Sequence, residues 1–239
     1  MKTKPLGIKG YGSIPHLPDS RTGPGDHKIS QGQADICNKE TRDRHDEIIV
    51  TEKLDGSNVS ITRIGDEVIA LTRAGLRCTQ SRFPHHHMFA RWVRESDIIF
   101  NCFLKDKERI VGEWIALAHG TRYKDVKEPF LAFDIISVIN EREPYNIAIQ
   151  RFDKMGLSYP KLLHRGGAAS IDYILKRLGR HGHHGATDKA EGAVWRVERK
   201  GIFDFLAKYV RPEKKDGILL VDENNKQLPD DQLIWNWKM

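Results

Sequence analysis

Short segments in which apolar and polar residues alternate recur along most of the chain. The run Ile48-Ile49-Val50 opens the series, and strong β-formers fill the segments that follow. Gly65-Asp66 separates the second segment from the third, as a hairpin turn does. The pattern predicts strands at residues 47–52, 58–64, 67–72, 110–114, 130–136, 192–197 and 205–210.

Helical spacing is clear in one segment and weaker in another. Between a good N-cap, Ser170, and a good stop, Gly179, apolar residues follow an i, i+3, i+4, i+7 pattern. These residues are Ile171, Ile174, Leu175 and Leu178. A weaker stripe consists of Phe89, Trp92, Val93 and Ser96. Many strands and few helices indicate an α+β domain dominated by antiparallel strands.

The first 46 residues differ from the rest of the chain because Gly and Pro are frequent there and few apolar positions alternate. We expect residues 1–46 to form an arm that is packed on the core or flexible beside it, not a domain. Residues 47–239 are then one main domain with a short C-terminal tail.

Composition limits the class of protein. Of the 239 residues, 39% are hydrophobic and 30% charged, which is typical of a globular protein, and the net charge of +6 permits a phosphate-bearing partner. Three widely spaced cysteines suggest neither a disulfide framework nor a zinc ribbon. The longest apolar stretch, 130–139, contains Asp134 and is too short for a bilayer, and the N-terminus lacks a signal-peptide core. We therefore expect a cytoplasmic protein without membrane segments, and a monomer.

The most informative segment is Lys53-Leu54-Asp55-Gly56, at the end of the first predicted strand. Gly56 lets the backbone approach a ligand closely, and a lysine at such a turn can act as a nucleophile. Only about one lysine in a thousand is neutral near pH 7.4, so its pKa must fall for it to attack. Alone, this motif fits a surface turn equally well.

Further segments follow the lysine turn in a fixed order. They are Thr72-Arg73-Ala74-Gly75, Val111-Gly112-Glu113-Trp114, Phe130-Leu131-Ala132-Phe133-Asp134-Ile135, Glu191-Gly192-Ala193-Val194 and Leu206-Ala207-Lys208-Tyr209-Val210-Arg211. Together the six segments resemble the motifs of the covalent nucleotidyltransferase superfamily of polynucleotide ligases and mRNA capping enzymes. Ser57-Asn58 directly after the lysine turn is similar to the ATP-dependent RNA ligase family in particular.

This resemblance implies two antiparallel sheets with flanking helices and a nucleotide in the cleft between them. It implies that Lys53 attacks the α-phosphorus of ATP to form lysyl-AMP. AMP then passes to a 5′-phosphate, and a 3′-hydroxyl seals the RNA, with Mg²⁺ or Mn²⁺ at each step. RNA repair is the expected role, with RNA ends as the partner and DNA as an open possibility.

The resemblance also assigns roles to single residues. Lys208 contacts the α-phosphate and lowers the pKa of Lys53, and Glu191 holds the metal ion. A larger set of residues is expected to contact the ribose, the phosphates or the base, or to orient the lysine turn. In that set Glu113 binds the ribose, Phe133 stacks on adenine, Glu52 accepts from the adenine amino group, Arg73 and Asn58 lie toward ribose or phosphate, Asp134 lies near the sugar, Leu54 contacts the nucleotide and Asp55 orients the loop.

Two departures from the family pattern stand out. The last motif usually reads Lys-x-Lys, but Val210 stands in the second lysine position and Arg211 follows it. In a regular strand Arg211 faces away from Lys208, so a bulge is needed for both to reach one phosphate. In addition, the 46-residue arm and the 28 residues after Arg211 are too short for an oligonucleotide-binding barrel, which leaves efficient sealing open.

Two other features have simpler interpretations. His85-His86-His87 and His181, His183 and His184 are interpreted as surface-loop histidines because no cysteine lies near them to complete a zinc site. Trp235-Asn236-Trp237 is expected to dock the tail on the body, with base stacking as the other possibility.

The sequence therefore predicts an ATP-dependent RNA ligase. Two alternatives remain open at this point. One is a DNA ligase or a guanylyltransferase with the same covalent chemistry. The other is an RNA-binding module that becomes adenylylated but does not seal efficiently.

Overall fold

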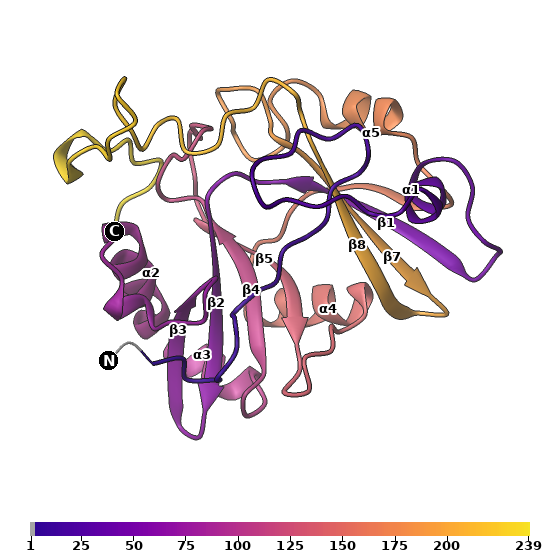
Figure 1. Ribbon diagram of the computed structural model, residues 1–239. Coiled ribbons are helices and arrows are strands. Elements are labelled where there is room, and N and C mark those ends of the chain that lie inside the picture. Colours follow the sequence, from indigo (N-terminus) through magenta and orange to yellow (C-terminus); the bar gives the residue numbers. More distant parts are fainter. Residues whose placement is uncertain (1–2) are drawn as a thin grey trace.

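The computed structural model describes residues 3–239, in which eight strands form two four-stranded antiparallel sheets (Figure 1). In the first sheet the strand order is β6-β1-β7-β8, and in the second it is β3-β2-β4-β5. The strands of the first sheet are β1 (Asp46–Lys53), β6 (Leu162–Gly166), β7 (Gly192–Arg199) and β8 (Ile202–Val210). Those of the second are β2 (Ser57–Ile64), β3 (Glu67–Thr72), β4 (Arg109–Trp114) and β5 (Phe130–Ile136).

The seven predicted strands are confirmed to within a few residues at their ends, and the α+β class with two antiparallel sheets is confirmed too. The hairpin between β2 and β3 turns at Gly65, whose φ of 58° favours glycine. The sequence did not indicate β6. It is a five-residue edge strand in which only Leu163 is buried, so it carries almost no hydrophobic alternation.

Five helices cover the sheets: α1 (Gln31–Asn38), α2 (Pro84–Glu95), α3 (Asp97–Phe103), α4 (Tyr145–Met155) and α5 (Ile171–Leu178). The prediction for α5 is confirmed: the Ser170 hydroxyl accepts from the Tyr173 N–H, and Gly179 ends the helix at φ 69°. The weak stripe at 89–96 lies in α2, which begins earlier. The other three helices, α1, α3 and α4, were not predicted, although Pro144 and Gly156 flank α4.

Each sheet has its own hydrophobic core. Helices α2, α3 and α4 pack against the β3-β2-β4-β5 sheet, around Phe89, Trp114 and Phe152. Helix α5 packs against β6 and β7 of the other sheet, whose core includes Trp195 and also Leu17 from the N-terminal segment. A smaller apolar cluster, which includes Tyr11, Val111, Ile136 and Leu206, joins the two sheets to each other and to the arm.

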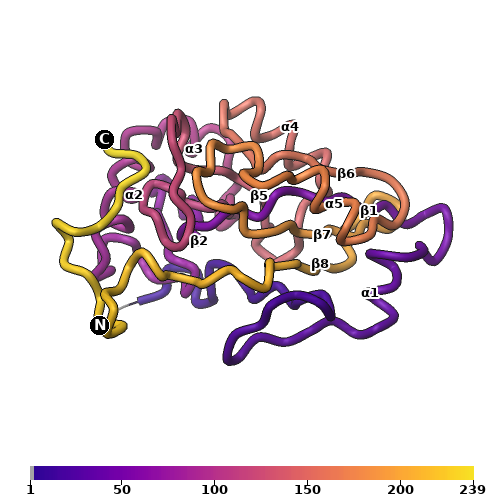
Figure 2. The backbone as a smooth tube through the Cα atoms, turned by 90° about the horizontal axis from the view of Figure 1, so that it is seen from above, coloured from indigo at the N-terminus to yellow at the C-terminus, as the bar shows by residue number. Residues whose placement is uncertain are grey.

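The N-terminal arm crosses both sheets (indigo in Figures 1 and 2). The Tyr11 N–H donates to Arg73 O beside β3, and the Leu17 N–H donates to Lys208 O on β8. Within residues 3–46 the arm is therefore packed on the core, and it also contains α1; residues 1 and 2 lie outside the described part. The arm buries Leu17 and Ile29 in the core of the first sheet, so it stabilises the body it covers.

The C-terminal tail docks as predicted. The Asn236 N–H donates to Ala116 O, and the ring of Trp237 meets the ring of Trp114 edge-on at 5.7 Å. Across residues 3–239, every helix is too short or too polar to cross a lipid bilayer.

Candidate active site

A cavity of about 350 Å³ lies between the two sheets, and we call it the first cavity. Residues from β1, β2, β4, β5, β7, β8 and the arm line it. Of the residues that the sequence singles out, those that line it are Glu52, Lys53, Leu54, Asp55, Asn58, Arg73, Glu113, Phe133, Asp134, Glu191 and Lys208. Segments spread over more than 150 positions of sequence thus meet around one space.

Strand pairing brings Lys53 and Glu191 together. Lys53 is the last residue of β1 and pairs with Gly192, the first residue of β7, so Glu191 lies beside it. The chain then turns at Gly56, where a Cβ atom would lie 2.5 Å from Trp114 O. Only glycine fits that approach, which is why the turn after the lysine has this residue.

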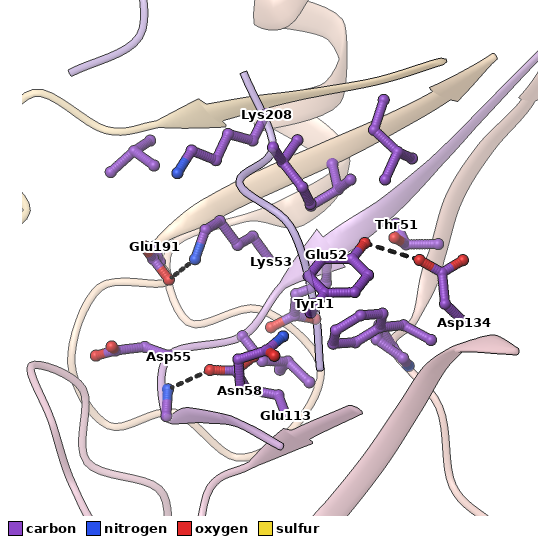
Figure 3. Close-up of a pocket in the computed structure, with 18 of the residues that line it drawn as sticks. Tyr11, Thr51, Glu52, Lys53, Asp55, Asn58, Glu113, Asp134, Glu191 and Lys208 are labelled. Carbon is purple, nitrogen blue, oxygen red and sulfur yellow. Dashed lines mark hydrogen bonds and ion pairs between the residues drawn. The ribbon is translucent and has the colours of Figure 1, made fainter. Parts of the chain in front are cut away.

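The Lys53 ammonium lies partly buried among carboxylates. Its Nζ donates to Glu191 Oε2 at 2.6 Å, as Figure 3 shows. Burial lowers the pKa of Lys53, but the negative charges of Glu191, Glu113 and Asp55 outweigh burial and raise it above the usual range. In this structure the carboxylates hold the proton on the amine, and the lowering expected from Lys208 stays a prediction.

Burial penalises the negative charge of Glu113 and Glu191. Burial raises the pKa of Glu113 to about 8, and it also raises the pKa of Glu191 above its usual value. Glu113 Oε1 accepts from the Gly56 N–H at 3.1 Å, which is a weak compensation for a buried carboxylate. The two carboxylates therefore favour an additional positive charge in the cavity.

These two carboxylates could supply part of the ligand set of a hard divalent cation. Within residues 3–239, no group of three or more His, Cys, Asp or Glu side chains is placed to hold a metal ion by itself. Mg²⁺ commonly binds through one or two carboxylates and completes its shell with phosphate oxygens and water. Glu191 and Glu113 match that donor set.

Asp55 ties the lysine turn to two other parts of the chain. Its Oδ2 accepts from the Gly120 N–H at 2.8 Å and from Lys214 Nζ at 2.7 Å, and Lys214 also donates to Thr121. Asp55 is thus held on the side of the turn away from the opening. Lys214 was missed by sequence reasoning, because it stands in an irregular charged segment with no periodicity to place it.

Arg211 is not among the described residues that line the first cavity. Its Nη2 donates to Gly179 O at 2.7 Å, and its backbone N–H donates to Glu191 O. The strand β8 ends at Val210, so the bulge that would bring Arg211 to the phosphate side is not formed there. Lys214, three residues later, is the cation that reaches the lysine turn instead.

Lys208 faces Lys53 from β8 (Figure 3). Burial and the charge of Lys53 lower the pKa of Lys208. The arm adds a partner, Asp26, whose Oδ1 lies 3.9 Å from Lys208 Nζ. Asp26 is itself held by the Gly23 N–H and lies 3.2 Å from His16 Nε2.

Seven arm residues line the first cavity: Tyr11, Gly12, Ile14, His16, Arg21, Gly23 and Asp26. Motif spacing could not place them, because a coil segment can cross the sheets anywhere.

The opposite end of the first cavity contains Phe133 and Asp134. Phe133 meets Tyr11 edge-on at 5.4 Å. Asp134 is bound by the Tyr11 hydroxyl at 2.7 Å, by Arg196 Nη1 at 2.7 Å and by Arg142 Nε at 3.0 Å. Its carboxylate is thus fully engaged within the protein.

Glu52 lies under the loop that contains His181, His183 and His184. Its Oε2 accepts from the His183 N–H at 2.9 Å, and burial raises its pKa to about 7. A side chain at Gly182 would collide with this carboxylate, since a Cβ would lie 2.0 Å from Glu52 Oε1. The loop therefore covers this end of the cavity.

Asn58 and Arg73 lie toward the opening. The Asn58 Oδ1 atom is buried and has no hydrogen-bond partner within residues 3–239, while Arg73 is exposed at the rim. An unpaired buried carbonyl is costly and indicates room for a donor from a ligand.

The surface-loop interpretation is right for some of the histidines and wrong for others. His181 and His183 are exposed as expected, but His85 and His86 lie in the first turn of α2, and His85 is only 5% exposed. The helix begins at Pro84, before the weak apolar stripe, so its histidines were assigned to a loop.

Comparisons with known proteins agree with this geometry. A family model described as RNA ligase matches residues 46–210. An archaeal ATP-dependent RNA ligase structure (form 2) superimposes with a TM-score of 0.57 at 22% identity, covering 84% of this chain and 48% of that one. A point mutant of Naegleria gruberi RNA ligase with ATP and Mn has a TM-score of 0.53 at 15% identity, covering 85% and 61%. No curated protein matches the sequence.

The two-sheet fold is shared with the solved RNA ligase structures. Because the family model matches well over half of its residues, this chain belongs to the RNA ligase family. The chain spans about half the length of the archaeal structure.

Proposed function

We propose that this chain is an ATP-dependent RNA ligase that forms a lysyl-AMP intermediate on Lys53. The observation that carries the proposal is the partly buried Lys53 Nζ, 2.6 Å from Glu191 Oε2 and opposite Lys208, in a cavity between two sheets. A related RNA ligase was solved with ATP and Mn, which supports ATP and a metal ion for that protein.

In the first step, the lone pair of Lys53 Nζ attacks the α-phosphorus of ATP. An N–P bond forms, the bond from the α-phosphorus to the β-phosphate oxygen breaks, and pyrophosphate leaves. Glu191 Oε2 already accepts a hydrogen bond from Nζ and is the nearest acceptor for its proton. Lys208 supplies positive charge for the α-phosphate oxygens, as phosphoryl transfer requires.

The raised pKa of Lys53 must be overcome before this attack. Glu191 and Glu113 would hold a divalent cation, and its charge would weaken the attraction by which these carboxylates keep the amine protonated. Asp55 remains neutralised by Lys214 and keeps the turn in position.

The remaining assignments concern the nucleoside. Phe133 would offer an aromatic face to the base, and Glu52, which lines the cavity and has a pKa of about 7, would contact the adenine amino group. Glu113 and Asn58 lie on the ribose side, with Arg73 and Leu54 nearer the opening. Asp134 acts through Tyr11 and the arginines that bind it, not as a free acceptor for the sugar.

In the later steps AMP passes to an RNA 5′-phosphate, and a 3′-hydroxyl attacks that phosphate with release of AMP. We propose the cytoplasm as the compartment and RNA repair as the role. Residues 1–46 are proposed to be part of the catalytic body, since Asp26 lies beside Lys208. Arg211 is not proposed as a phosphate ligand.

Incubation with α-³²P-labelled ATP and Mg²⁺ tests the proposal. Wild type and Lys176→Ala, which changes an exposed lysine on α5, are expected to become labelled, and Lys53→Ala is not. Unlabelled wild type would refute the proposal. Labelling from GTP in place of ATP would indicate a guanylyltransferase, and sealing of DNA nicks but not RNA would indicate a DNA ligase. Labelling without joining of any end would indicate a non-sealing module.

A further inference from the structure

A second cavity, of about 740 Å³, lies beside the first. Its walls come from the ends of β2 and β3, the first turn of α2 and the C-terminal tail, which runs beside α2 in Figures 1 and 2. Asn58, Arg73 and His119 line both cavities. A ligand in the second cavity would therefore be next to the nucleotide bound near Lys53.

The walls of the second cavity are mostly apolar. Phe83, Pro84, Leu117, Leu220 and Leu233 contribute to them. Flat, uncharged groups bind well between apolar and aromatic walls, whereas an ion loses its hydration there without compensation. This composition favours a heterocycle over an anion in the interior.

Two imidazoles add polar atoms to these walls. His85 is 5% exposed, and its Nδ1 has no hydrogen-bond partner within residues 3–239, while His86 Nδ1 lies 2.7 Å from Ser81 Oγ. Burial lowers the pKa of His85 to about 2 and that of His86 to about 4, so both rings are neutral at pH 7. A buried polar atom without a partner indicates a place for a ligand's hydrogen bond.

Positive charge is confined to the rim. Arg73 and Arg82 are exposed, and neither forms an ion pair within the described residues. The Arg82 guanidinium lies 4.8 Å from the Phe83 ring centre. The N-terminus of α2, at Pro84, has no side-chain cap. Arginines at the mouth of an apolar pocket suit a phosphate attached to a buried base.

We propose that the second cavity binds one nucleotide of the RNA to be joined, with its base inside the cavity and its phosphate at the rim beside Arg73 and Arg82. This inference rests on the proposed function. The shared wall at Asn58 places this nucleotide beside the reacting phosphate. The nucleotide belongs to the 3′-hydroxyl end or to the 5′-phosphate end, and the experiment distinguishes these two sources.

The test separates RNA binding from lysyl-AMP formation. Arg82→Ala removes a rim charge just before α2, and Arg91→Ala removes an exposed charge on α2 outside the cavity. Gln227→Glu adds a negative charge at the cavity, and Asn224→Asp adds one to the same tail outside it. Binding of a 5′-phosphorylated oligoribonucleotide is measured by fluorescence anisotropy, and lysyl-AMP formation is measured with ATP alone.

Arg82→Ala and Gln227→Glu are expected to weaken RNA binding by about five- to tenfold, as loss of one phosphate contact does, with unchanged lysyl-AMP formation. The two control variants should bind RNA within about twofold of wild type, since an exposed charge far from the ligand is screened. Equal RNA binding by all five proteins, or an equal loss in the controls, would overturn the inference.

Oligonucleotides with one abasic position then identify the base. Removing the base at the end that occupies the cavity should weaken binding to wild type. The same abasic oligonucleotide should lose less affinity for Gln227→Glu, because that variant already binds the base poorly. An equal cost in both proteins for both ends would overturn base binding. If wild type forms no lysyl-AMP but these binding differences remain, the proposed function fails while the cavity assignment stands.

Discussion

Two buried clusters of charged residues border the first cavity, and they differ in how their charges are balanced (Figure 3). Around Asp134, two arginines and the Tyr11 hydroxyl bind one carboxylate. Around Lys53, Glu191 binds the ammonium, and the partly buried Glu113 accepts one hydrogen bond, from the Gly56 N–H.

The difference shows in the pKa values. In the lysine cluster burial raises the pKa of Glu113 to about 8, and the carboxylates raise the pKa of Lys53 above its usual range. In the Asp134 cluster, Arg196 also donates to Glu198 at 2.6 Å, so the network continues into further compensated pairs. A balanced cluster stabilises the fold, whereas an unbalanced one is suited to bind a ligand that completes it.

The largest effect is expected from Asp134→Asn. This change removes one of the two carboxylates that bind Arg196, whose side chain is 6% exposed, and leaves Glu198 as its charged partner. Breaking a buried pair costs up to about 3–5 kcal/mol. Urea unfolding should show that loss in the free energy of unfolding. A loss below about 1 kcal/mol would mean that the cluster does not hold the sheets together.

The next effect concerns chemistry, not stability. Glu191→Gln should slow lysyl-AMP formation by about 100-fold or more, the range seen when one charge-stabilising group of an active site is removed. Single-turnover labelling with ATP measures the rate. If the rate stays within about threefold of wild type, Glu191 neither accepts the Lys53 proton nor holds the metal ion.

Glu113→Gln tests the imbalance through pH. The pKa of Glu113 is raised from 4.5 to about 8 in the folded chain, so the folded state binds more protons and its stability falls as pH rises from 4.5 to 8. Glutamine lacks this penalty. The variant's melting temperature should exceed that of wild type at pH 8 and match it near pH 4.5. A lower melting temperature at pH 8 would show that Glu113 is a stabilising partner of Lys53.

The smallest effect belongs to a surface pair that serves as a reference for both clusters. Glu67 binds Arg77 with its side chain 56% exposed. Glu67→Gln should change the free energy of unfolding by less than about 1 kcal/mol, because solvent screens such pairs. The same urea titration measures it, and a loss as large as that of Asp134→Asn would remove the contrast between buried and exposed pairs.

Much of the fold was accessible from sequence because its strands alternate and its turns carry glycine. The strand at 67–72 and the helix Ile171–Leu178 are confirmed at their predicted bounds. The edge strand β6 and the helix α3 were missed, since β6 buries only Leu163 and α3 only Phe100. One buried residue gives no period to detect.

The chain by itself determined the family motifs, the lysine turn and the strands that carry them, because these depend on residues near one another in sequence. Only the tertiary structure decided which distant residues complete the site: Lys214 at Asp55, Asp26 at Lys208 and Tyr11 at Asp134. It also decided the direction of the Lys53 pKa shift. A pKa depends on the distances to every nearby charge and on burial, and both exist only once the sheets have come together.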